Sequence, residues 1–297
     1  MTIAMSPRRR QLVLAALSSP FAGGALAAAG AANPYAALPT YAALEQAFGG
    51  RVGVCLIDTA SGAVTGHRAD ERFAMCSSFK AIAAAAILAR SVAQTGLLDK
   101  RIAYTSEDLV SYSPVTEQHV GDGMTIGALC AATVQYSDNG AANLLLRELG
   151  GPAAVTAFAR SAGDMQFRLD RWETELNSAV PGDPRDTTTP AAMAALLKRL
   201  VLGDGLPPAQ QRILADWLIG NKTGDARIRA AVPARWRVGD KTGTGGVYGA
   251  VSDIAVLWPD GRAPLVLAVY TGHTAQAEKG SSELIAAAAR IALAGVI

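Results

Sequence analysis

The β-strand signals of this 297-residue chain lie at its two ends, and a long helical stretch separates them. Apolar residues alternate from Val52 to Leu56 before a DTASGA turn. Further strands are predicted over residues 236–244, 247–258 and 265–270. Because a strand needs partners to bury its apolar face, we expect both ends to build one sheet. The pattern predicts an α/β fold of the α+β type: an antiparallel sheet flanked by helices, with an inserted all-helical lobe.

Helical periodicity fills the rest of the chain. One helix is predicted from Thr40 to a Gly49-Gly50 stop, and another over residues 282–293. The predicted middle helices are residues 77–93, 125–136, 139–149, 152–162, 190–202 and 208–219. Residues 106–124 and 169–189 lack clear periodicity. Loops this long inside a compact domain are uncommon and usually functional, so both stretches are candidate site segments.

The first 31 residues have the features of an export signal. Three arginines, Arg8 to Arg10, precede a mildly apolar run and Ala-x-Ala cleavage options after Ala27 or Ala31. The Arg-Arg-x-Leu-Val run resembles a twin-arginine signal. A membrane anchor is the alternative, but Ser18-Ser19-Pro20 interrupts the apolar run. We therefore expect a periplasmic or secreted mature protein, with no later segment apolar enough to span a membrane.

The mature chain is predicted to have two domains. Residues 32–68 and 220–297 would form the α/β sheet domain, and residues 69–219 the all-helical domain, which includes the loop 169–189. The formal net charge is +2, and removal of the three signal arginines leaves about −1, which gives no electrostatic reason to expect a nucleic-acid partner. The spacing of the three cysteines and three histidines matches no metal site.

The segment MCSSFKAIAAAAIL places Ser77 three residues before Lys80, so that the two side chains would share one helix face. A lysine on such an apolar helix is costly to bury unless its amine has a partner or a chemical task. The alternative is structural: Ser77 or Ser78 caps the helix and Lys80 is solvated.

Three further stretches are individually weak signals. YSDNG, with Ser137 to Asn139, is by itself a turn. GDKTGTGG, with Lys241, could be a basic edge strand or a bulge. RWETELN, with Glu173, could be a charged loop with an aromatic anchor.

Taken in order, Ser-x-x-Lys, Ser-Asp-Asn and Lys-Thr-Gly form the motif set of penicillin-recognising serine enzymes. With Glu173 between the last two motifs, the chain resembles a class A serine β-lactamase over essentially its whole mature length. The resemblance implies hydrolysis of β-lactam antibiotics, both penicillins and cephalosporins, through a covalent acyl-serine intermediate that confers resistance. It also implies a monomer without metal or cofactor, whose partners are β-lactam substrates and inhibitors.

The same resemblance assigns the catalytic roles. Ser77 would be the nucleophile, and Lys80 or Glu173 the base that assists acylation. Glu173 would activate water for deacylation. Ser137 would carry a proton to the ring nitrogen, and Lys241 would supply positive potential.

Other residues are expected to bind substrate or hold the loop. The backbone N–H groups of Ser77 and Thr244 would form the oxyanion hole. Arg171 and Asp186 would pair across the neck of the loop. Arg227 would anchor the substrate carboxylate, and the alternative is a plain surface charge. Tyr112 would form part of the cleft wall, and the alternative is a plain exposed tyrosine. The full set of expected substrate-binding residues is Asn139, Asn177, Tyr112, Arg227, Thr242, Gly243 and Thr244.

The chain departs from the family pattern at its cysteines. Cys76 precedes the nucleophile, as in carbapenem-hydrolysing members, but Gly245 stands where its disulfide partner would be. Cys130 resembles a cysteine that in other members pairs with one seven residues past the nucleophile, and this chain has Ala84 at that position. We predict three free thiols, and carbapenem hydrolysis is left open.

Four rival functions are weaker. A D,D-peptidase or penicillin-binding protein lacks the loop glutamate, and a penicillin sensor is normally tethered to a membrane. A metallo-hydrolase would need ligand spacing among the histidines. A Ser-His-Asp hydrolase would need a Gly-x-Ser-x-Gly elbow.

Overall fold

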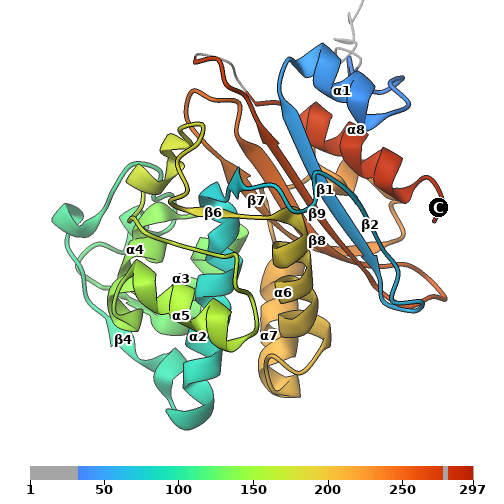
Figure 1. The fold of residues 1–297 in the computed structure, drawn as a ribbon. Helices are drawn as coiled ribbons and strands as arrows, with labels where there is room; N and C mark the ends of the chain where they lie inside the picture. Colours follow the sequence, from blue (N-terminus) through green and yellow to red (C-terminus); the bar gives the residue numbers. More distant parts are fainter. Residues whose placement is uncertain (1–32, 277–279, 297) are drawn as a thin grey trace, which may run out of the picture. The chain divides into compact units, whose positions relative to one another are not determined.

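A five-stranded antiparallel sheet, built from both ends of the chain, is the central layer of the fold (Figure 1). The computed structural model describes residues 33–276 and 280–296, so the signal predicted over residues 1–31 lies outside the described part. The strand order is β2-β1-β9-β8-β7. The strands are β1 (Arg51–Asp58), β2 (Val64–His67), β7 (Arg237–Thr244), β8 (Val251–Trp258) and β9 (Leu265–Gly272). The N-terminal strand β1 is thus inserted beside the C-terminal strand β9, with Arg51 opposite Gly272.

Each face of the sheet is covered by its own helices. On one face, α1 (Tyr41–Phe48) and α8 (Ser282–Leu293) bury Val54 and Leu56 of β1. On the other face, α6 (Pro190–Leu202) packs against β1, β8 and β9. On this face, Cys55 and Ile57, which alternate along β1 with Val54 and Leu56, belong to a second hydrophobic core that includes residues of α6. The period-two pattern of β1 therefore supplies apolar side chains to both cores.

The middle of the chain forms a helical lobe beside the sheet (Figure 1). Helix α2 (Phe79–Ala93) is its centre, and it packs against four other helices. Those are α3 (Ile126–Gln135), α4 (Asn139–Leu149), α5 (Pro152–Ser161) and α7 (Pro208–Ile219). The run Cys76–Ala93 is long and apolar enough to cross a membrane by length and composition, so the expectation of no such segment was wrong. Of this run, 72% is buried, because α2 forms the core of the lobe.

Short elements connect the helices. Two small two-stranded sheets pair β3 (Phe73–Ala74) with β6 (Thr187–Thr188) and β4 (Arg101–Ile102) with β5 (Met124–Thr125). Single 3₁₀ turns are η1 (Cys76–Ser78), η2 (Leu97–Asp99), η3 (Ser106–Asp108), η4 (Thr116–His119), η5 (Glu175–Ser178) and η6 (Ile228–Ala231). These elements were missed because two-residue strands and single turns carry no readable periodicity.

The predicted fold class is confirmed, and most predicted helices agree with the structure within one or two residues. One local expectation was wrong, and so was one alternative. The third predicted strand begins at Val251 and not at Val247, because the chain turns through Gly249 at φ 60°. Ser77 and Ser78 also make no side-chain capping hydrogen bond to the helix. The Ser78 hydroxyl instead donates to the carbonyl of Met75 at 2.8 Å.

Candidate active site

The nucleophile candidate lies where the helical lobe meets the sheet. Ser77 is in the short turn η1, directly before α2, and the strand β7 runs beside this turn. A Cβ atom at Gly243 of β7 would overlap the carbonyl oxygen of Met75, at 2.6 Å. The absence of a side chain at Gly243 therefore permits the close approach that brings Thr244 and Ser77 into one cleft.

Lys80 is fully buried, one helical turn beyond Ser77, and its amine is surrounded by oxygen atoms. Its Nζ donates to the carbonyl of Ser137 at 2.7 Å and to Oδ1 of Asn139 at 2.6 Å. It lies 3.0 Å from Oε1 of Glu173. Burial lowers the pKa of Lys80 below its ordinary value, and the charge of Glu173 opposes this shift. The alternative of a solvated lysine is therefore wrong.

The Glu173 carboxylate contacts Ser77, Lys80 and Asn177. Its Oε1 accepts a hydrogen bond from the Ser77 hydroxyl at 3.3 Å, and its Oε2 accepts one from Nδ2 of Asn177 at 2.5 Å. Because Lys80 faces the same Oε1, serine, lysine and glutamate form one connected group. Such a group can transfer a proton away from the serine hydroxyl.

The loop that carries Glu173 is fixed at two places. Arg171 donates from Nε to Oδ2 of Asp186 at 2.6 Å, and Oδ1 of Asp186 accepts the backbone N–H groups of Asp170 and Arg171. Asn143 of α4 clamps the backbone of Glu173, accepting from its N–H at 3.0 Å and donating to its carbonyl at 2.8 Å. Sequence analysis missed Asn143, and its place one turn after Asn139 on a helix was the only available signal.

The Ser-Asp-Asn turn contributes side chains from the opposite wall. Ser137 has φ 58°, in the left-handed region, and its carbonyl faces Lys80. Asn139 donates from Nδ2 to the carbonyl of Ser111 at 2.8 Å, which fixes its amide. Asp138 faces away and accepts from Thr116 and the backbone of Ala141, so it holds the turn.

Strand β7 supplies the third wall. Lys241 is fully buried and donates to Oγ of Ser137 at 3.0 Å and to the carbonyl of Thr242 at 2.9 Å. Burial lowers the pKa of Lys241 well below its ordinary value, and the positive charge of Lys80 adds to this effect. The Thr242 hydroxyl forms a 2.5 Å hydrogen bond with the hydroxyl of Thr223. Thr223, also missed by sequence analysis, thus extends the row of hydroxyl groups.

Arg227 is almost buried at the end of this row, so the alternative of a surface charge is wrong. Its guanidinium donates to the carbonyls of Gly243 at 2.8 Å and Ser252 at 2.6 Å, and to Oγ1 of Thr244 at 2.8 Å. Burial lowers the pKa of Arg227 from its ordinary value. The guanidinium ties β7, β8 and the cleft wall together.

These walls enclose a cleft of about 410 Å³. Tyr112, which is 61% exposed, lies at its rim, and its carbonyl accepts from the backbone N–H of Asn139. The cleft is lined by Ser77, Tyr112, Ser137, Asn139, Asn177, Thr223, Arg227, Thr242, Gly243 and Thr244. Lys80, Glu173 and Lys241 lie buried behind this lining. Arg171 and Asp186 lie at the neck of the loop.

Backbone strain gathers around the cleft and its loop. Six non-glycine residues in the described part of the chain have positive φ, and only Arg68 lies away from the site. The other five are Cys76, Tyr112, Ser137, Ala179 and Asp186. Such strain persists where surrounding contacts over-determine the backbone, as at functional sites.

The three cysteines are free, as predicted, and all three are buried. A Cβ atom at Gly245 would lie 3.0 Å from Sγ of Cys76, so the position of the missing disulfide partner is directly opposite. Across residues 33–276 and 280–296, no group of three or more His, Cys, Asp or Glu side chains could hold a metal ion.

Comparison with known proteins identifies the family. The model of the β-lactamase enzyme family matches residues 39–296. The carbapenem-hydrolyzing β-lactamase KPC of Klebsiella oxytoca is 57% identical over 292 residues, covering 98% of each chain. The β-lactamase CTX-M-25 of Escherichia coli is 52% identical and covers 86% of this chain and 87% of its own. A mutant of the last common ancestor of Gram-negative bacteria class A β-lactamase superposes with a TM-score of 0.82 at 58% identity, covering 86% of this chain and 96% of its own. Since these matches span most of the chain, it belongs to the class A serine β-lactamases.

Proposed function

We propose that Ser77 opens the β-lactam ring and that Glu173 prepares the water that releases the product. The observation that carries this proposal is the position of Oε1 of Glu173, which accepts from the Ser77 hydroxyl at 3.3 Å and faces Nζ of Lys80 at 3.0 Å. A serine hydroxyl does not ionise at neutral pH, so it needs such an acceptor.

In acylation, the Ser77 oxygen attacks the lactam carbonyl while its proton passes to Glu173, or to Lys80 once the lysine has given up its own proton. The resulting oxyanion would be held by the backbone N–H groups of Ser77 and Thr244. Ser137, hydrogen-bonded to Lys241, would then give a proton to the ring nitrogen as the C–N bond breaks. The proton taken up by Glu173 would return to Ser137 through Lys80, so that Glu173 is again a carboxylate before deacylation. Thr242, Lys241 and Arg227 would attract the substrate carboxylate, and Asn139 would contact the substrate side chain.

In deacylation, a water between Glu173 and Asn177 would lose a proton to Glu173 and attack the acyl carbon. The ester bond to Ser77 then breaks, and the serine oxygen recovers a proton. The contact of Asn177 with Oε2 supports this role, because it leaves the amide beside the carboxylate that activates the water.

The proposed substrates are penicillins and cephalosporins. Hydrolysis of carbapenems is a second candidate, favoured by the 57% identity with a relative named as carbapenem-hydrolyzing. We further propose that the mature enzyme is a monomer exported to the periplasm or the medium. The division into a sheet domain (32–68 with 220–297) and a helical domain (69–219) remains our proposal as well.

Glu173→Ala tests the proposal most directly. With benzylpenicillin, this variant should still form an acyl adduct but lose deacylation by about 10²–10⁴-fold. Intact-protein mass spectrometry would detect the stalled adduct. Glu175→Ala, an exposed glutamate on the same loop, is the matched control and should turn over normally. Turnover of Glu173→Ala at the parent rate would refute the assignment. A panel of benzylpenicillin, a chromogenic cephalosporin and a carbapenem would define the substrate range.

A further inference from the structure

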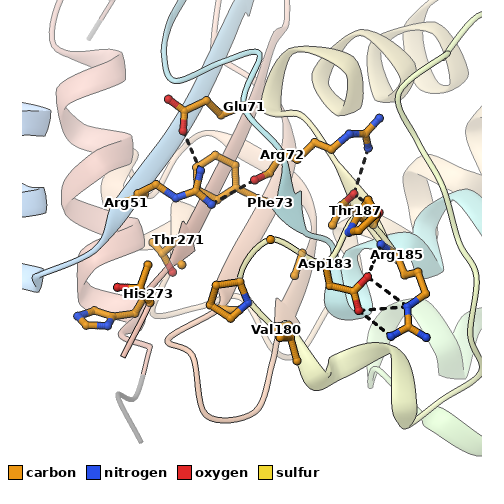
Figure 2. A pocket seen from close by; sticks show the side chains of 18 of the residues that line it. Arg51, Glu71, Arg72, Phe73, Val180, Asp183, Arg185, Thr187, Thr271 and His273 are labelled. Carbon is orange, nitrogen blue, oxygen red and sulfur yellow. Dashed lines mark hydrogen bonds and ion pairs between the residues drawn. The ribbon is translucent and has the colours of Figure 1, made fainter. Parts of the chain in front are cut away.

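A second cavity, of about 460 Å³, lies behind the loop that carries Glu173 (Figure 2). It is larger than the catalytic cleft, and the two share no lining residue. Its walls come from the start of β1, the end of β9, strand β3 and loop residues 179–185. A volume of this size is typical of small-molecule sites.

The cavity carries an excess of positive charge. Four arginines line it, Arg51, Arg72, Arg171 and Arg185, against the two carboxylates of Glu71 and Asp183. Glu71 is shared, because it binds Arg51 at 2.8 Å and Arg68, outside the cavity, also at 2.8 Å. Asp186, the partner of Arg171, adds a third carboxylate. Four arginines then stand against three carboxylates, which leaves an excess of one positive charge.

Part of the remaining lining is apolar and contains one aromatic ring. The guanidinium of Arg51 lies over the ring of Phe73, 4.6 Å from its centroid. Figure 2 shows this pair facing the loop that contains Val180, across the cavity. Pro181 and Pro184 complete the apolar wall. Such a surface fits a planar ring, and the adjoining arginines fit an anionic group on that ring.

We propose that this cavity binds a small aromatic carboxylate and that its occupant alters the position of the loop carrying Glu173. The coupling runs through Arg171, which is two residues before Glu173 in the sequence. Arg171 lines the cavity and also pairs with Asp186 at the neck of the loop. Because the loop forms one wall, an occupant that touches Val180 changes the free energy of the docked loop. This step rests on the proposed role of Glu173, whereas the binding site itself does not.

The binding test uses 2-naphthoate and isothermal titration calorimetry. Arg51→Met should weaken binding about tenfold or more and Arg51→Lys should restore part of it, while Glu71 keeps Arg68 as its partner. Arg237→Met is the matched control, because Arg237 also stacks on an aromatic ring, 4.8 Å from the centroid of Trp258, but lies outside the cavity. Equal affinity in the parent and in Arg51→Met would overturn the proposal.

A cavity-filling variant gives an independent arm. A Cβ atom at Gly272 would meet only Phe73, at 3.9 Å, so Gly272→Leu projects into free space and should abolish binding. Gly295→Leu, where no atom lies within 4 Å, is the control and should bind normally. Binding that survives in Gly272→Leu would place the naphthoate elsewhere and refute the site.

Two readouts separate this site from the catalytic cleft. Binding should persist when the stalled acyl-enzyme of Glu173→Ala blocks the cleft, and its loss there would overturn the proposal. In the parent, saturating naphthoate should change kcat at least twofold with little effect on KM. An unchanged kcat would refute the coupling to the loop. Calorimetry does not depend on turnover, so failure of the binding site and failure of the proposed hydrolysis are distinguishable.

Discussion

The amine of Lys80 lies 3.0 Å from the carboxylate of Glu173, and both side chains are fully buried. The two residues come from different parts of the chain, one from the central helix α2 and one from the loop before α6. Within the described residues, the Ser77 hydroxyl is hydrogen-bonded to the carboxylate and not to the amine. Removal of the lysine and removal of the glutamate should therefore have different consequences.

Lys80→Met should slow acylation by about 10²–10⁴-fold, because the nucleophile loses both a proton acceptor and the group that orients Glu173. It should also lower the free energy of unfolding by about 3–5 kcal/mol, because a buried carboxylate is left without its ion partner. Stopped-flow acylation and chemical denaturation measure the two effects. Acylation at the parent rate would show that Lys80 takes no part in the step. Lys198→Met, at a half-buried lysine of α6, serves as the control.

Asn143→Leu should destabilise the loop through two lost hydrogen bonds to the backbone of Glu173. Each buried backbone group left unpaired costs about 1–3 kcal/mol, so the unfolding free energy should fall by about 2 kcal/mol or more. Deacylation should slow more than acylation, because deacylation depends on Glu173 alone, whereas acylation can also use Lys80 as the proton acceptor. Asn143→Asp keeps the acceptor oxygen and should recover part of the loss. Equal slowing of both steps would contradict a loop-positioning role.

Asp253→Asn tests the buried acids behind Lys241. Burial and the nearby Asp240 raise the pKa of Asp253 well above its ordinary value, and its Oδ1 has no hydrogen-bond partner among the described residues. Above pH 3.8 the folded state therefore retains a proton that the unfolded state releases, so this group's contribution to stability falls as pH rises. Because asparagine carries no charge, the Asp253→Asn variant does not lose stability in this way as pH rises.

The difference in Tm between Asp253→Asn and the parent should accordingly increase in favour of the variant from pH 4 upward. Thermal denaturation across that range measures it. Asp260→Asn, an exposed aspartate after β8, should show no such trend. A pH-independent difference for Asp253→Asn would show that the pKa of this carboxyl is not raised in the folded protein.

Gly245→Cys should form a disulfide with Cys76. The Cβ of residue 245 would lie 3.0 Å from Sγ of Cys76, and a Cβ lies about 3 Å from its partner's sulfur in a disulfide. The Cβ atoms of Ala250 and Ala179, at 3.0 and 3.2 Å, must yield slightly. The unfolded, unreduced variant should titrate two free thiols in place of four. Four titratable thiols after oxidation would contradict this geometry.

Sequence alone determined the order of elements and the chemical residue types of the site. The period-two run of β1 and the apolar periodicity of α2 are local patterns, so they could be interpreted without a structure. Ser77 and Lys80 are one helical turn apart, and their shared face also follows from local geometry. The motif order then pointed to the family, and comparison with relatives confirmed it.

Tertiary structure decided everything that depends on contacts distant in sequence. Asn143 meets Glu173 only because α4 packs beside the loop, and Thr223 meets Thr242 only because the chain returns to β7. The charged cavity joins Arg51 to residues 179–185, which no local pattern connects. Hydrogen bonds and burial require specific distances between remote segments. A linear pattern carries residue types and local periodicity, whereas packing alone sets those distances.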